Sequence, residues 1–167
     1  WTKLYKAGSG SPMLRFIGAG ENICWASYDY EIFSMPRPEI DPDAELRVEH
    51  ILRTIHEAGW PSRQHMTYNE TIDRLLPVYE RVAHDVGGLA PHWVVDHAET
   101  ITEQNIERIA RLGGGIAVQN RIAYQAMDFL RQYGAAELAQ TPPLRKMLKM
   151  GVPVGGGTDS TRVSSYN

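Results

Sequence analysis

The chain has 167 residues, of which 43% are hydrophobic and 22% charged, and its 17 Lys+Arg and 20 Asp+Glu give a formal net charge of −3. This composition is typical of a soluble globular domain, and without a run of Lys or Arg it argues against a nucleic-acid partner. No segment approaches the roughly 20 apolar residues of a membrane span, so we expect no membrane partner. The single cysteine, Cys24, excludes an internal disulfide framework. The length also falls well below the roughly 250 residues of a complete (β/α)8 barrel.

The first residues lack the pattern that is typical of a targeting signal. Residues 1–5 lack a start methionine, and no basic segment followed by an apolar one is present. We therefore expect that a signal peptide is absent or already removed. Localisation stays open, with the cytoplasm slightly favoured.

The pattern of apolar residues divides the chain into a loop-rich segment and a series of β/α units. Residues 1–42 are rich in Gly and Pro and contain one predicted strand, over 13–17. From residue 43 onward, strands are predicted to begin near residues 60, 93, 116 and 152, which are 33, 23 and 36 residues apart. This spacing suits β/α units around a parallel sheet, so we expect an α/β fold in a single domain. Helical periodicity predicts helices over residues 43–58, 69–86, 102–112, 121–133 and 143–150.

Polar residues at the carboxyl ends of the predicted strands are the candidate functional residues. In a parallel sheet these ends face a common mouth, and here they carry His65, His97, Gln119 and Asp159. Two imidazoles and a carboxylate from separate strands form a ligand set suited to zinc or a similar divalent ion. Structural interpretations stay open beside this one. The two histidines could be satisfied core residues, and the aspartate could cap a turn after three glycines.

The remaining histidines are assigned to packing or solvent. Three of them lie in predicted helices and one lies at the amino end of a predicted strand, where a parallel sheet places structural residues. They are His50, His56, His84 and His92.

Four segments, in order, resemble the elements of strands five to eight of the metal-dependent amidohydrolase superfamily, and within it the Amidohydro_3 or YtcJ-like group. The first two segments each carry a histidine, the third ends in Gln, and the fourth contains Gly-Thr-Asp. Four ordered motifs at family-like spacing are a fairly specific signal, and the match that they define extends over most of residues 45–167. The segments are residues 58–65, 94–99, 113–119 and 150–160.

The resemblance implies a partial (β/α)8 TIM barrel covering about strands 4–8, with a parallel sheet and flanking helices. It implies that His65 and His97 bind a divalent metal, with zinc favoured, and that Asp159 binds the metal and acts as general base on the attacking water. Gln119 and Arg121 are candidate substrate contacts. The implied activity is hydrolysis of an amide or related C–N bond in a small-molecule substrate.

Departures from the family pattern limit this activity. The family's first strand supplies a His-x-His pair, and no His-x-His occurs in this chain. The fourth-strand position that often holds a carboxylated lysine aligns with Arg15 if residues 13–18 are that strand, which leaves Glu21 as a candidate substitute ligand. After the fifth strand, Asn69 replaces the family's acid. We therefore expect poor metal retention and little hydrolysis by this chain alone.

Two other interpretations stay open. A non-catalytic half-barrel would expose sheet edges and apolar inner faces, which favours a binding or assembly module that forms a homodimer or associates with the remainder of a longer chain. A flavodoxin-like doubly wound domain also fits the β/α alternation and the length, although no phosphate-binding glycine turn follows the first strand.

Overall fold

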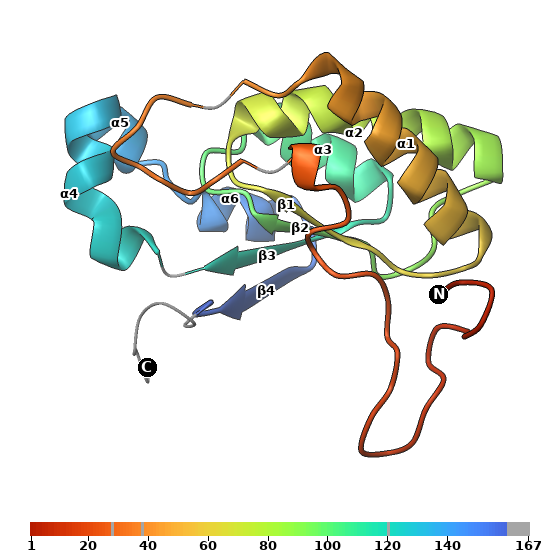
Figure 1. The fold of residues 1–167 in the computed structure, drawn as a ribbon. Coiled ribbons are helices and arrows are strands. Elements are labelled where there is room, and N and C mark those ends of the chain that lie inside the picture. The colour runs from red at the N-terminus through yellow and green to blue at the C-terminus, as the bar shows by residue number, and fades with distance from the viewer. Residues whose placement is uncertain (28, 38, 120, 160–167) are drawn as a thin grey trace.

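The computed structural model describes residues 1–27, 29–37, 39–119 and 121–159. Ser160, the last residue of the fourth family-like segment, lies outside them. A parallel sheet forms the centre of the fold (Figure 1), and its strands are β1 (Arg63–Met66), β2 (Val94–His97), β3 (Gly115–Gln119) and β4 (Val154–Gly157). The helices are the 3-10 turn η1 (Trp25–Ser27), α1 (Pro42–Glu57), α2 (Asn69–Val86), α3 (Glu103–Arg111), α4 (Ile122–Tyr133), α5 (Ala135–Leu138) and α6 (Leu144–Lys149).

The strand order shows how the chain winds. Each strand pairs in parallel with the next one along the chain, which gives the order β1-β2-β3-β4. Because parallel crossovers are right-handed, repeated steps in one direction place the connecting helices on the same face of the sheet. Figure 1 shows α1, α2 and α3 together on one side of the strands. The described strands thus wind like a barrel wall, without the reversal of order on which a doubly wound flavodoxin-like sheet depends.

Helix α1 confirms the helix predicted over residues 43–58. The Asp41 side chain accepts a hydrogen bond from the Asp43 backbone N–H at 2.9 Å, and Pro42 occupies the first turn, where its missing N–H is not needed. Gly59 follows the helix with φ +70°, a left-handed conformation that costs glycine little. The buried face of α1 consists of Ala44, Val48, Leu52 and Ile55.

Helix α2 has the predicted bounds, 69–86. It ends because Gly87 adopts φ +78°, and the N–H of this glycine caps the carbonyl of Ala83. Its apolar face packs against α1 and the sheet. That face consists of Ile72, Leu75, Leu76, Tyr79 and Val82.

The strand predicted over residues 13–17 is wrong. These residues lie in a loop that projects away from the sheet (Figure 1), where Met13 is 93% exposed and Arg15 forms an isolated antiparallel bridge to Gly10. Pairing with the outer side of β1 begins several residues later, where Ala19 bridges to Ser62 in parallel. The apolar run was misleading because the sheet edge is formed by the backbone of residues 18–21, which has no hydrophobic pattern to detect.

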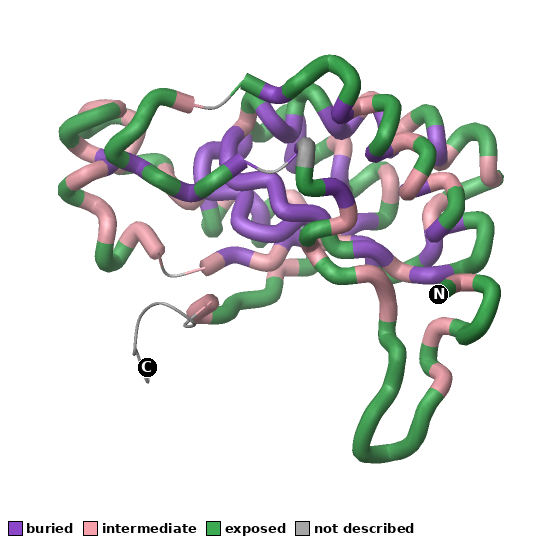
Figure 2. The backbone as a smooth tube through the Cα atoms, viewed as in Figure 1, coloured by how far each residue is buried: buried purple, intermediate pink, exposed green. Residues whose placement is uncertain are grey.

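Burial is uneven across the sheet. Figure 2 shows buried backbone at the centre of the sheet and under the helices, whereas the projecting loop and β4 are mostly exposed. The strand β4 starts two residues later than predicted, and its three glycines, 155–157, are exposed.

The short helix α5 was not predicted, because four residues are too few for an apolar period. Among the described residues, no helix is long and apolar enough to cross a membrane.

Candidate metal centre

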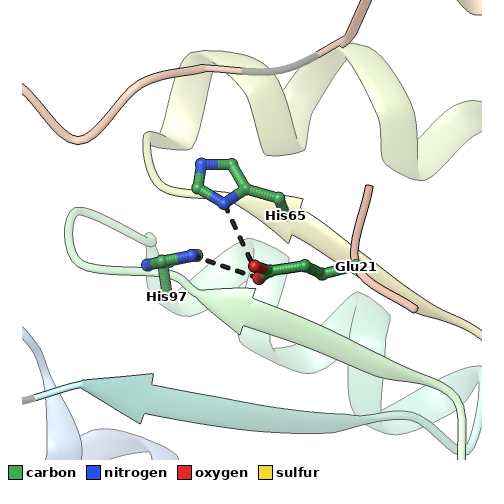
Figure 3. Close-up of side chains that lie close together, drawn as sticks. All are labelled: Glu21, His65 and His97. Carbon is green, nitrogen blue, oxygen red and sulfur yellow. Dashed lines mark ion pairs between the residues drawn. The ribbon is translucent and has the colours of Figure 1, made fainter. Parts of the chain in front are cut away.

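Glu21, His65 and His97 meet beside the carboxyl ends of β1 and β2 (Figure 3). Backbone pairing brings the three residues together. The N–H of His65 donates to the carbonyl of Glu21 at 3.1 Å, and Met66 is the register partner of His97 between the two strands. The imidazole centroids consequently lie 4.0 Å apart, with the Glu21 carboxylate beside both rings.

The distances within this cluster suit a divalent cation. Glu21 Oε2 lies 3.8 Å from His65 Nδ1 and 3.4 Å from His97 Nε2, and the three ligand atoms all lie within 4.8 Å of one another. Ligands about 2.0–2.1 Å from a tetrahedral zinc ion are about 3.3 Å apart, close to these separations. Both imidazoles are buried, whereas the glutamate side chain is 39% exposed. The three residues therefore fit a cation that enters from the glutamate side.

The outward nitrogen of each histidine faces a different environment. His65 Nε2 lies 2.6 Å from the main-chain oxygen of Asp29 and 3.1 Å from its Oδ1. His97 Nδ1 lies 3.9 Å from Glu99 Oε1, too far for a hydrogen bond. The nitrogens that face Glu21, and are available to a metal ion, are therefore Nδ1 of His65 and Nε2 of His97.

The backbone of β2 turns sharply at its end. His97 and Ala98 have φ +77° and φ +53°, a left-handed region that costs a residue with a side chain about 1–3 kcal/mol. Such strain is frequent at functional sites, and here it lies at the candidate ligand His97 and at the residue that follows it.

Negative charge surrounds the two imidazoles. Burial alone would lower the pKa of His65, but hydrogen bonds to the carboxylates of Asp29 and Glu21 raise it to about 10. Contacts with both histidines hold the pKa of Glu21 far below its usual range. Burial raises the pKa of Glu99 to about 7. The site thus favours a positive charge between the carboxylates, either a proton or a metal ion.

Asp159 and Arg121 form a second group of charges beside the cluster. Arg121 Nη2 lies 2.8 Å from Asp159 Oδ2 and 2.8 Å from Glu31 Oε1, and the other oxygen of Glu31 is 3.6 Å from His65 Nε2. In the described part of the chain, Asp159 is not a member of the close group of three ligands. Its role as a ligand and general base, and that of Arg121 as a substrate contact, stay predictions.

Gln119 ends β3, as expected for a strand-end residue. Its side-chain oxygen is buried and has no hydrogen-bond partner among the described residues. This leaves an acceptor available, and its assignment to substrate stays a prediction.

Asp29 and Glu31 are site residues that sequence reasoning missed. They belong to a segment outside the helices and strands in which burial alternates, with Asp29, Glu31 and Phe33 buried and Tyr30 and Ile32 exposed. The signal was present as a period of two, but with its acidic residues facing inward. Such a pattern normally predicts the opposite orientation.

Comparisons with known proteins find solved structures with a similar fold. Solved structures of two uncharacterized metal-dependent hydrolases share the fold, one from Pyrococcus furiosus (14% identity, TM-score 0.69) and one from Pyrococcus horikoshii OT3 (19% identity, TM-score 0.58). The first match covers 95% of this chain and 34% of that structure, and the second covers 70% and 23%. The chain therefore spans about a third of the length of the former structure and matches about a quarter of the latter.

Comparison of the sequence itself with protein families gives a match along nearly the whole chain. No curated protein sequence matches it. The model of Amidohydro_3, described as the amidohydrolase family, matches residues 4–167. Since that match extends over nearly every residue and the fold agrees with it, this chain belongs to the amidohydrolase family.

Proposed function

We propose that the chain carries part of the active site of a metal-dependent hydrolase, in which Glu21, His65 and His97 hold a divalent cation. The observation that carries the proposal is the close approach of one carboxylate and two buried imidazoles at the ends of neighbouring strands. Family membership supports the hydrolytic class of reaction. Zinc suits two histidine nitrogens and a carboxylate, so it is the cation we favour.

Each of the chain's site residues has its own role in the proposed hydrolysis. A cation bound here would polarise a substrate carbonyl and lower the pKa of a bound water. The buried His65 and His97 supply ring-nitrogen lone pairs to the cation, and the partly exposed Glu21 supplies a negative charge on the solvent side. Asp159, held by Arg121, takes a proton from the attacking water, whereas Gln119 and Arg121 contact the substrate. The bond cleaved is an amide or related C–N bond of a small molecule.

The proposed site is incomplete in this chain. We assign β1–β4 to strands five to eight of a (β/α)8 barrel, with the edge residues 19–21 at the place of strand four. The His-x-His pair of the family's first strand is absent from the sequence. We therefore expect weak metal binding and little turnover by this chain alone.

Zinc titration of the purified chain, followed by calorimetry, tests the proposal. We expect one zinc ion per chain, with affinity reduced by more than about 100-fold in His65→Ala and His97→Ala. Even loss of a group behind a metal ligand costs about 10–100-fold, so loss of a ligand should cost more. His84→Ala is the matched control, because the His84 side chain is 89% exposed on α2. Equal zinc binding by the parent and the His65→Ala, His97→Ala double variant would refute the assignment.

A second candidate function is an assembly module, and the outer edge of β4, which pairs with no other strand than β3 among the described residues, favours it. Unpaired parallel edges invite pairing with another strand. The partner would be a second copy of the chain or the remainder of a longer chain. Light scattering during size-exclusion chromatography separates the two functions. A dimer that binds zinc supports a reconstituted site, whereas a folded monomer that binds none supports the non-catalytic module.

A further inference from the structure

Asp29 lies directly behind His65, on the side of the ring away from Glu21. Its main-chain oxygen is 2.6 Å and its carboxylate Oδ1 is 3.1 Å from His65 Nε2. The aspartate is completely buried, and so is the histidine. The two residues are 36 positions apart in the sequence, so this contact depends on the path of the loop that precedes α1.

Asp29 is itself held in place by the backbone that follows β1. Its two carboxylate oxygens lie 2.9 Å and 3.0 Å from the N–H of Thr67, and Oδ2 also accepts from the N–H of Tyr68 at 3.0 Å. Tyr68 is the N-cap residue of α2 and makes no side-chain cap of its own. The Asp29 carboxylate therefore accepts from the two N–H groups that lead into this helix, where negative charge is also favoured by the helix dipole.

We propose that Asp29 is a positioning residue: it accepts the Nε2 proton of His65 and fixes the ring so that Nδ1 faces Glu21. The benefit to a cation rests on the function proposed above, whereas the ring orientation is a property of the chain itself. An imidazole donates a lone pair to metal from one nitrogen only, and a hydrogen bond at the other nitrogen decides which one. Rotation of the ring by half a turn would move Nδ1 away from Glu21.

The other histidine lacks an equivalent support. Glu99 approaches His97 Nδ1 only to 3.9 Å, and neither of its carboxylate oxygens has a hydrogen-bond partner among the described residues. The arrangement around Asp29 therefore differs from that of a buried carboxylate merely close to a histidine. Two oxygens of Asp29 face His65 Nε2, which also lies 3.1 Å from Thr67 Oγ1, and two backbone N–H groups hold the aspartate carboxylate.

The test compares the parent chain with Asp29→Asn, Asp29→Ala and Asp41→Ala. Asp41 caps α1 through its side chain, so its loss removes a helix cap without touching either histidine, which makes it the matched control. Nitrogen-15 NMR of the imidazole rings in the metal-free chain reports the proton on His65 Nε2. We expect a slowly exchanging Nε2 proton in the parent and in Asp41→Ala, and loss of that signal in Asp29→Ala. Asp29→Asn retains an oxygen for the Thr67 and Tyr68 N–H groups, so we expect an intermediate exchange rate.

Zinc affinity supplies the second measurement. We expect it to fall about 10-fold in Asp29→Asn and up to about 100-fold in Asp29→Ala, and to stay within about two-fold in Asp41→Ala. An unchanged Nε2 signal in Asp29→Ala would overturn the inference, because the main-chain oxygen of residue 29 and Thr67 Oγ1, the other partners of Nε2, would then suffice. If the parent chain binds no zinc, the proposed function fails, and the ring-proton spectra still decide the role of Asp29. Circular dichroism of each variant checks that α2 remains folded.

Discussion

The two edges of the sheet, at β1 and at β4, differ in how completely other parts of the chain surround them. β1 and β2 lie under α1 and α2, have edge residues 19–21 on their outer side, and end in the two buried histidines. On the other side, β4 is a largely exposed run of glycines, and the strand-end residues Gln119 and Asp159 do not join the cluster of ligands. The same strand-end position thus produces a compact site only where neighbouring segments also enclose it.

The largest expected effect tests whether stability is concentrated on the β1–β2 side. Leu76 of α2 is completely buried in the main core, whereas Leu148 of α6 is 66% exposed. Leu76→Ala removes packed methyl groups and leaves a cavity, so we expect it to lower the free energy of unfolding by about 2–5 kcal/mol. Leu148→Ala, the matched change near β4, should stay within about 0.5 kcal/mol. Urea denaturation measures both, and similar losses would contradict the comparison.

The next effect concerns a buried histidine that supports the entry to β1 and β2. His56 Nδ1 accepts from the N–H of Ala90 at 3.0 Å, so its Nε2 carries the proton and donates to Ser62 Oγ at 3.1 Å. Burial lowers its pKa to about 4. Protonation of Nδ1 would break the contact with Ala90. The unfolded chain, with an ordinary histidine pKa of 6.5, therefore takes up a proton first as the pH falls.

This difference predicts acid sensitivity in a defined window. Stability is unaffected by this group above pH 6.5 and falls between pH 6.5 and about 4, by about 3 kcal/mol in all. His65 acts in another window, because its raised pKa stabilises the fold below pH 6.5 and that contribution is lost between 6.5 and about 10. Urea denaturation at several pH values should give a shallower acid slope for His56→Gln than for the parent. His84→Gln, at an exposed position, should retain the parent slope, and equal slopes for all three would disprove the assignment.

Local signals explain which parts of the fold were predictable. The bounds of α2 could be predicted because Gly87 ends the helix through its own backbone conformation. The cap at Asp41 is equally local. By contrast, the edge pairing of residues 19–21 depends on where β1 lies, and no property of their side chains predicts that pairing. The exposed run at 13–17 shows the converse, since its apolar residues do not enter the core.

The candidate site was predictable to the extent that it depends on strand ends. His65 and His97 could be singled out because parallel strands bring their carboxyl ends together, and Glu21 was recognised through a family resemblance. The inward orientation of Asp29 and Glu31 depends on the tertiary path of the loop before α1. Likewise, the contact of Asp159 with Arg121 joins residues 38 positions apart, which no local pattern determines.

The smallest expected effect tests the pairing of residues 19–21 along β1, at the enclosed edge of the sheet. A Cβ on Gly18 would lie 2.5 Å from the carbonyl oxygen of Pro61, a backbone atom that cannot rotate away. We expect Gly18→Ala to shift residues 19–21 from β1, lower the free energy of unfolding by about 1–3 kcal/mol and reduce zinc affinity about 10-fold through Glu21.

Gly20→Ala is the control for this change, because a Cβ at Gly20 meets no atom within 4 Å. It should be neutral or slightly stabilising, since alanine restricts the unfolded chain. Hydrogen exchange at the His65 amide, which donates to the Glu21 carbonyl, reports the edge pairing directly. Faster exchange in Gly18→Ala alone would support the view that pairing along β1 holds Glu21 at the site. Equal zinc affinity in the two variants would show that the glutamate reaches the histidines without that pairing, and the contrast between the two edges of the sheet would then have no bearing on the metal centre.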